Sequence, residues 1–241
     1  MIMGMPITVE VVGGQAAILD EIFSYFEYID KKFSPFKNES EISMINSGRL
    51  TPNDWSKDVH LVFDLAERTK QETDGYFDII SPKGLIDPSG LVKGWAINNA
   101  AAMIKEMGYR DFFIDAGGDI AVGGRNGKGE DWTVGIRDPF RKTGIVKSIK
   151  LKDKTGIATS GSYERGEHIW NPKNKANAPK DIVSITVIGP DVYEADRFAT
   201  AAFAMGRNGV RFIEGRPELE AYSIDRAGLA TMTNGFPKYV A

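Results

Sequence analysis

Alternating apolar and polar residues predict the β-strands of this chain. Residues 7–12 read Ile-Thr-Val-Glu-Val-Val, the period-two pattern of a strand with one buried face. A short apolar run at 112–114 predicts a second strand. Further strands are predicted at 132–136, 145–151, 182–188 and 219–224.

Apolar residues at helical spacing predict the helices. One face of the segment 15–32 carries Ile18, Ile22, Phe23, Phe26 and Ile29. Longer helices are also predicted at 54–73, 91–107 and 192–205. Ser40 is a predicted N-cap for a short helix that carries Ile42 and Ile45.

The order of these elements follows neither strict strand–helix alternation nor the even spacing of an all-β protein. It predicts an α+β fold with mainly antiparallel sheets and helices packed on them. The length of 241 residues suits one domain over 1–241, or two intimately packed subdomains.

Composition narrows the chemistry. The chain has no cysteine and two histidines, His60 and His168. Thiol nucleophiles, thiolate zinc sites, iron–sulfur clusters and three-histidine zinc sites are therefore excluded. A net charge of −3 argues against a nucleic-acid partner. No apolar window approaches the roughly 18 residues of a membrane span, and no signal peptide is visible, so the cytoplasm is the expected location.

Glycine is concentrated in one region. Of the 26 glycines, eleven lie between Gly84 and Gly135. There Asp87-Pro88-Ser89-Gly90 opens directly into a predicted helix, whose free N–H groups attract phosphate or carboxylate. Lys93 adds a cation, and Asp87 could accept from a base or a sugar hydroxyl. The alternative is a capped helix start with a surface lysine.

The paired glycines Gly117 and Gly118 follow an apolar strand and precede Asp119. They allow positive φ and close contact with a flat ligand, or they form a simple tight turn. The segment from Thr159 to His168 is rich in hydroxyl groups and broken by glycine, which favours a phosphate-binding loop. The alternative for His168 is a structural hydrogen bond.

Asp196 and Thr200 are four residues apart in a predicted helix, so both side chains project from one face. A carboxylate and a hydroxyl on one face suit a hard cation such as Mg²⁺. A local hydrogen bond between the two side chains is the alternative.

These motifs occur together in a recognisable order: Met3-Gly4, FSPFKNESEISMIN, DGYFD, IDPSGLVKGWA, DAGGDI, WTVGIRDP, ATSGSYERGEHIWNP and VSITVIGPDVYEADRFATAAFAMG. In this order they resemble the ApbE family, the FAD:protein FMN transferases, over nearly the whole chain. The resemblance implies an enzyme that uses Mg²⁺ to transfer FMN from FAD to a Thr or Ser hydroxyl of an acceptor protein, releasing AMP. Alternatives are a FAD pyrophosphatase that gives FMN and AMP, and a non-catalytic FAD-binding protein.

The resemblance also implies roles for individual residues. The metal would be held by Asp196, Thr200 and the Gly90 carbonyl. Asp196 and His168 are the candidates for the base that accepts the proton of the acceptor hydroxyl. The implied FAD contacts are Met3, Phe36, Tyr76, Asp87, Lys93 and Trp170.

Two departures from the family pattern bear on the site. The segment after Asp78 is shorter than in most relatives, which predicts a more open FAD pocket. Trp170-Asn171 stands where relatives often have Ile-Asp, so one negative charge is lost and a stacking surface is gained.

Overall fold

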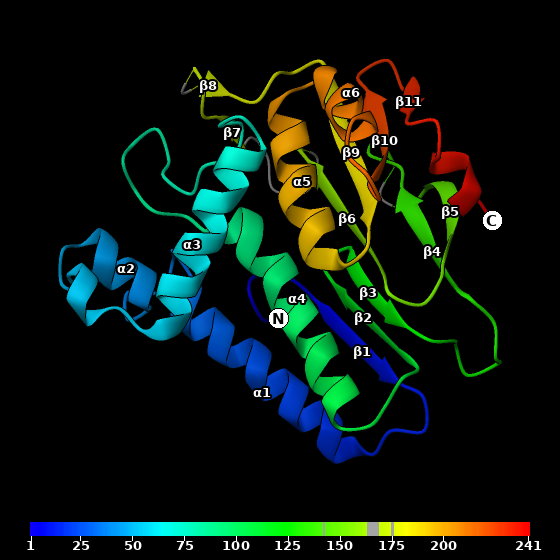
Figure 1. The fold of residues 1–241 in the computed structure, drawn as a ribbon, viewed down its shortest axis with the longest axis horizontal. Helices are drawn as coiled ribbons and strands as arrows, with labels where there is room; N and C mark the ends of the chain where they lie inside the picture. The colour runs from blue at the N-terminus through cyan, green and yellow to red at the C-terminus, as the bar shows by residue number, and fades with distance from the viewer. Residues whose placement is uncertain (142, 163–168, 175) are drawn as a thin grey trace.

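A seven-stranded antiparallel sheet forms the centre of the molecule, in a computed structural model that describes residues 1–141, 143–162, 169–174 and 176–241 (Figure 1). Its strands are, in spatial order, β1 (Ile7–Val11), β2 (Phe112–Ala116), β3 (Asp119–Gly123), β6 (Thr155–Gly161), β9 (Ile182–Gly189), β10 (Glu220–Asp225) and β11 (Ala230–Met232). Two short two-stranded sheets accompany it: β4 (Trp132–Arg137) with β5 (Ile145–Leu151), and β7 (Trp170–Asn171) with β8 (Ala176–Asn177).

Helices cover one face of the sheet (Figure 1). The α-helices are α1 (Ala16–Phe33), α2 (Glu41–Asn46), α3 (Lys57–Glu72), α4 (Ser89–Glu106), α5 (Val192–Ala204) and α6 (Asn208–Glu214). The short 3₁₀ helices are η1 (Pro52–Asp54) and η2 (Phe236–Tyr239). The β4–β5 ribbon and η2 pack against the opposite face, which gives three layers.

Strand alternation separates the cores on the two faces. Ile120 and Val122 of β3 join the cluster that contains Trp132 of β4, whereas Ala121 joins the cluster under α1 and α4. Successive residues of a strand point to opposite faces, so one β-strand contributes to both cores. The predicted α+β architecture with antiparallel sheets is confirmed.

Local sequence explains where the helices begin and end. The hydroxyls of Ser40 and Ser56 accept the N–H groups of Ser43 at 3.0 Å and Val59 at 3.4 Å, capping α2 and α3. Asp74 and Gly75 follow the C-cap of α3 with φ of +51° and +76°, left-handed conformations that end the helix. The strands and helices predicted from periodicity are present, with bounds that differ by a few residues.

The described start of the hydroxyl-rich segment does not have the predicted loop structure. Its first part, Thr159 to Gly161, is not a loop but the end of strand β6, paired with β9. The other end of β6 also departs from an apolar pattern, because Gly156 lies against the start of α5, where an added Cβ would come 2.1 Å from the Val192 nitrogen. A strand that requires such close backbone contact lacks the usual strand composition.

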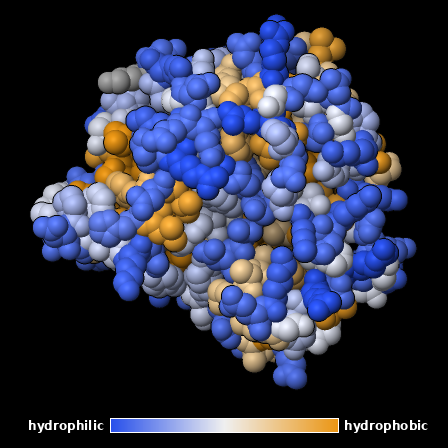
Figure 2. Space-filling model, in the orientation of Figure 1, coloured by the Kyte–Doolittle hydropathy of each residue, from blue (hydrophilic) through white to orange (hydrophobic). Residues whose placement is uncertain are grey.

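Hydrophilic residues cover most of the surface on the side that carries α3, α4 and α5 (Figure 2). Across the described ranges, no helix combines the length and the hydrophobicity needed to cross a membrane.

Candidate functional site

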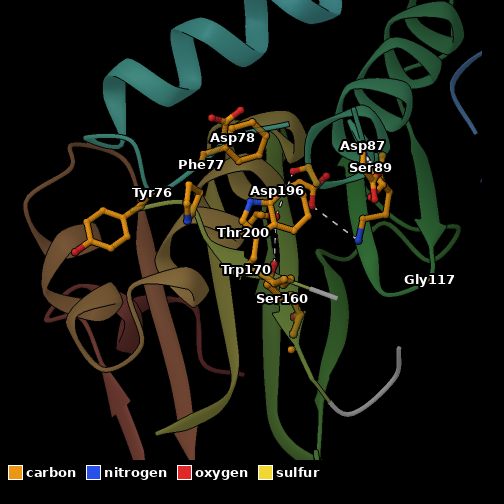
Figure 3. Close-up of a pocket in the computed structure, with 16 residues that line it drawn as sticks. Tyr76, Phe77, Asp78, Asp87, Ser89, Gly117, Ser160, Trp170, Asp196 and Thr200 are labelled. Carbon is orange, nitrogen blue, oxygen red and sulfur yellow. Dashed lines mark hydrogen bonds and ion pairs between the residues drawn. The ribbon is translucent and has the colours of Figure 1, made fainter. Parts of the chain in front are cut away.

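A cleft opens where the start of α4, the end of β6, the middle of α5 and the segment after α3 meet (Figure 3). The residues that line it are Tyr76, Phe77, Asp78, Asp87, Ser89, Gly90, Lys93, Gly117, Thr159, Ser160, Gly161, Ile169, Trp170, Pro172, Asp196 and Thr200.

Oxygen atoms from three elements converge at the base of this cleft. Thr200 Oγ1 donates to the Gly90 carbonyl at 3.2 Å and lies 3.4 Å from Ser160 Oγ. Asp196 is 2% exposed, and its Oδ2 accepts the Gly94 N–H at 2.7 Å. Thr200 therefore bonds to the start of α4. The alternative from the sequence was a local hydrogen bond between Thr200 and Asp196.

A lysine lies between two buried carboxylates. Lys93 Nζ is 2.5 Å from Asp119 Oδ2 and 3.8 Å from Asp196 Oδ1. The second oxygen of Asp119 accepts the Thr159 N–H at 3.0 Å. Lys93 is thus part of a buried ion-pair cluster and not the surface lysine of the alternative interpretation. With both carboxylates ionised, the cluster carries one excess negative charge, which favours a bound cation.

The protonation of Asp196 reflects this environment. Burial, together with the neighbouring Asp119 carboxylate, raises the pKa of Asp196 to about 8, although Lys93 and the Gly94 N–H act in the opposite direction. A metal ion at this position would replace the proton, because a carboxylate binds metal in its ionised form.

Gly94 allows the close approach of α4 and α5 that brings these groups together. A Cβ on this residue would come 2.6 Å from Asp196 Cβ and 2.8 Å from the Val192 carbonyl. The sequence places Gly90, Lys93 and Gly94 in the first turns of α4, and one face of α5 presents Asp196 and Thr200 to them.

The donor set fits a hard cation better than a soft one. Within the described part of the chain, no three or more His, Cys, Asp or Glu side chains are grouped so that they could hold a metal ion. The available ligands are a carboxylate, a hydroxyl and a backbone carbonyl, which are the oxygen donors that Mg²⁺ accepts beside water and phosphate.

The structure gathers most of the predicted site residues around this cleft. Besides the three predicted metal ligands, the lining contains Tyr76, Asp87, Lys93, Gly117 and Trp170.

The other predicted residues lie elsewhere. Met3 packs against the core under the helices, and Phe36 is 89% exposed. Gly118 donates its N–H to Asp115 Oδ1 at 2.7 Å in the tight turn between β2 and β3. Met3, Phe36 and Gly118 are not among the residues that line the cleft. His168 lies outside the described residues.

Asp119 and Ser160 are the main site residues that the sequence did not assign. Asp119 directly follows the paired glycines, so its position in the DAGGD motif was a signal for it. Ser160 follows Thr159 on β6. The sequence does not show that it lies near Thr200, because this depends on the packing of α5 over that strand.

Comparison with known proteins identifies the family. The sequence profile of the ApbE family matches residues 3–83 and 80–223. The chain belongs to the ApbE family. This result agrees with the order of motifs along the sequence.

Curated members of the ApbE family align with about two thirds of the chain. The protein of Escherichia coli K12 named FAD:protein FMN transferase is 28% identical over 166 residues, covering 66% of this chain and 47% of the relative. The Rhodobacter capsulatus protein of the same name is 31% identical over 177 residues, covering 65% and 33%. The alignments therefore span about half or less of these relatives.

Solved ApbE structures share the fold over nearly the whole chain. The flavin transferase ApbE of Vibrio cholerae superposes with a TM-score of 0.85 at 20% identity, covering 99% of this chain and 97% of the other. The ApbE protein of Thermotoga maritima gives 0.85 at 22% identity, covering 100% and 97%.

Proposed function

We propose that this protein is a Mg²⁺-dependent FAD:protein FMN transferase. The observation that carries the proposal is the convergence of Asp196, Thr200 and the Gly90 carbonyl beside Lys93 at the start of α4. The names of the curated relatives support the same activity.

Asp196, Thr200 and the Gly90 carbonyl would hold the metal, which would replace the proton of Asp196 and balance the negative charge of the ionised cluster. When bound, Mg²⁺ supplies positive charge that stabilises the phosphoryl oxygens as the pyrophosphate is cleaved. Lys93 adds a second cation on the same side of the cleft.

FAD would lie along the cleft with its pyrophosphate toward the start of α4. The N–H groups at this helix terminus favour an anion. Tyr76 and Trp170 offer aromatic surface for the flavin or adenine ring, and Asp87 offers an acceptor for a base or a sugar hydroxyl. Met3, Phe36, Gly117 and Gly118 remain proposed FAD contacts by their positions in the matching motifs.

The reaction exchanges one phosphorus–oxygen bond for another. The acceptor hydroxyl of a Thr or Ser residue attacks the FMN phosphorus, the pyrophosphate bond breaks, and AMP leaves. Asp196 or His168 takes the hydroxyl proton.

Product analysis tests the proposal. The protein is incubated with FAD, Mg²⁺ and a peptide that carries the Thr of an acceptor motif, and the products are separated by chromatography. Transfer predicts flavinylated peptide and AMP, with loss of both in Asp196→Ala and in excess EDTA. Free FMN and AMP without peptide labelling would identify a pyrophosphatase, and unchanged bound FAD would identify a binding protein; either result overturns the transferase proposal.

A further inference from the structure

Asn46 is the last residue of α2, and its side chain contacts a segment 40 residues further along the chain. Its Nδ2 donates to the Ile86 carbonyl at 2.8 Å, and its Oδ1 accepts the Ile86 N–H at 2.8 Å. A carboxamide carries a donor and an acceptor in one plane, like a peptide group. Asn46 therefore bonds to Ile86 as a neighbouring β-strand would.

The backbone around Ile86 requires such a partner. Ile80 and Ile86 form an antiparallel bridge, and the Asp87 N–H donates to the Ile79 carbonyl at 2.7 Å. In this pattern the bonds across the hairpin come from the residues that flank Ile86, so its own N–H and carbonyl face outward. Unpaired, these half-buried groups would lose hydrogen bonds and the hairpin edge would be free to shift.

The helix that carries Asn46 is itself firmly attached. Ser40 caps α2 and is buried, and Ile42 is fully buried in the core. Glu41 accepts the Ser56 N–H at 2.6 Å, which connects α2 to the start of α3. Asn46 therefore presents its carboxamide from a fixed support.

The residue after Ile86 enters the cleft. Asp87 Oδ1 accepts the Ser89 N–H at 3.0 Å, and α4 begins at Ser89. Asp87, Ser89 and Gly90 all line the cleft. A shift of Ile86 would thus be transmitted directly to Asp87 and to the first turn of α4.

We propose that Asn46 is a positioning residue for FAD: by holding Ile86, it fixes Asp87 and the start of α4 in the geometry that binds the dinucleotide. The proposal rests on the proposed function, because it assumes that FAD occupies this cleft.

The test compares two variants at Asn46 with one control. Asn46→Leu has similar size and loses both bonds, while Asn46→Asp keeps the acceptor and loses the donor. Asn99→Leu is the control, because Asn99 Nδ2 also makes a tertiary bond, to Tyr25 Oη at 3.0 Å, but the residue does not line the cleft. FAD affinity is measured by flavin fluorescence, and exchange of the Ile86 amide by NMR.

We expect Asn46→Leu to weaken FAD binding roughly tenfold or more, since two hydrogen bonds of ordinary strength are lost. Asn46→Asp should have an intermediate effect, and Asn99→Leu less than about threefold. The KM for FAD should rise more than kcat falls. In the background of Asp87→Ala, Asn46→Leu should add little, because the two residues act on the same contact.

Unchanged FAD affinity in Asn46→Leu would overturn the proposal, whether or not Ile86 exchange changes, as would fully additive effects of Asn46→Leu and Asp87→Ala. The wild-type product analysis is independent of these variants. A wild type that binds FAD without transferring FMN would overturn the transferase function and leave the positioning role to be decided by the binding data.

Discussion

Asp196 is a buried carboxylate whose charge state couples the site to the stability of the whole chain. In the absence of metal its pKa is raised from 3.8 to about 8, chiefly by burial. Between these values the folded protein holds a proton that the unfolded chain has released. The free energy of unfolding should therefore decrease as pH rises from about 4 to about 8.

We expect this contribution to reach a slope of about 1.4 kcal/mol per pH unit near neutral pH in EDTA, the value for one proton. Urea unfolding at several pH values between 5 and 8 measures it. Asp196→Asn should flatten the profile, because its amide does not titrate. Asp20→Asn, at an exposed position on α1, should leave the profile unchanged. Equal slopes in wild type and Asp196→Asn would contradict the assignment.

Individual site residues were predictable where the chemistry is local. Asp196 and Thr200 share one helix face, and Gly90 and Lys93 share one helix start, so spacing suggested a cation site and an anion site but left a local hydrogen bond and a capped helix start as alternatives. The ion pair between Lys93 and Asp119 was not predictable in this way, because it joins a helix to a β-strand across the core.

At the scale of elements, the site depends on how closely α4 and α5 approach. Glycine in a helix interior usually costs about 1 kcal/mol relative to alanine, so Gly94→Ala would ordinarily stabilise α4. Here the added Cβ would meet Asp196 Cβ at 2.6 Å and a backbone carbonyl at 2.8 Å.

We therefore expect Gly94→Ala to lower the free energy of unfolding by about 1–3 kcal/mol, the usual range for overpacking, and to reduce FMN transfer by displacing Asp196. Chemical denaturation and the transfer assay measure the two effects. Gly127→Ala is a suitable control, since nothing lies within 4 Å of its added Cβ. A stabilised and fully active Gly94→Ala would show that the helices separate without disturbing the site.

Elements with strong periodicity were predicted correctly, and those defined by tertiary contacts were not. The helix α1 differs from its prediction by one residue at each end. The end of strand β6, from Thr159 to Gly161, was predicted to be part of a loop, because small hydroxyl residues and glycine replace the apolar side chains that identify a strand. Strand β3, whose five residues are all buried, was hidden in the glycine-rich segment.

At the scale of the whole molecule, a buried arginine connects the helices α3 and α5. Arg197 is 2% exposed and pairs with Glu72 Oε2 and Glu194 Oε2, each at 2.5 Å. The ring centroid of Phe198 lies 4.2 Å from the guanidinium carbon of Arg197. Glu72 thus compensates the positive charge of Arg197, which would be costly to bury without a partner.

Glu72→Gln should lower the free energy of unfolding by about 1–3 kcal/mol, less than the loss of a fully buried partner because Glu72 is partly exposed. Arg68→Gln is the matched control: it removes the other partner of the same carboxylate, but Arg68 is largely exposed, so the change should stay below about 1 kcal/mol. Thermal unfolding distinguishes the two, and the KM for FAD should be unaffected in both. Equal destabilisation would show that the buried pair has no special role.

The distance along the chain between the two halves of the site has a consequence for biosynthesis. Gly94 and Asp196 are 102 residues apart, and Gly90 and Thr200 are 110 apart. A nascent chain emerging from the ribosome has α4 long before α5, so it cannot bind a ligand at this cleft until β1, β2, β3, β6 and β9 have also been synthesised. Ligand binding then stabilises only the completed fold, by mass action. A ligand of this cleft supplied during translation should accordingly protect nascent chains that already include α5 against proteolysis and leave shorter ones unaffected.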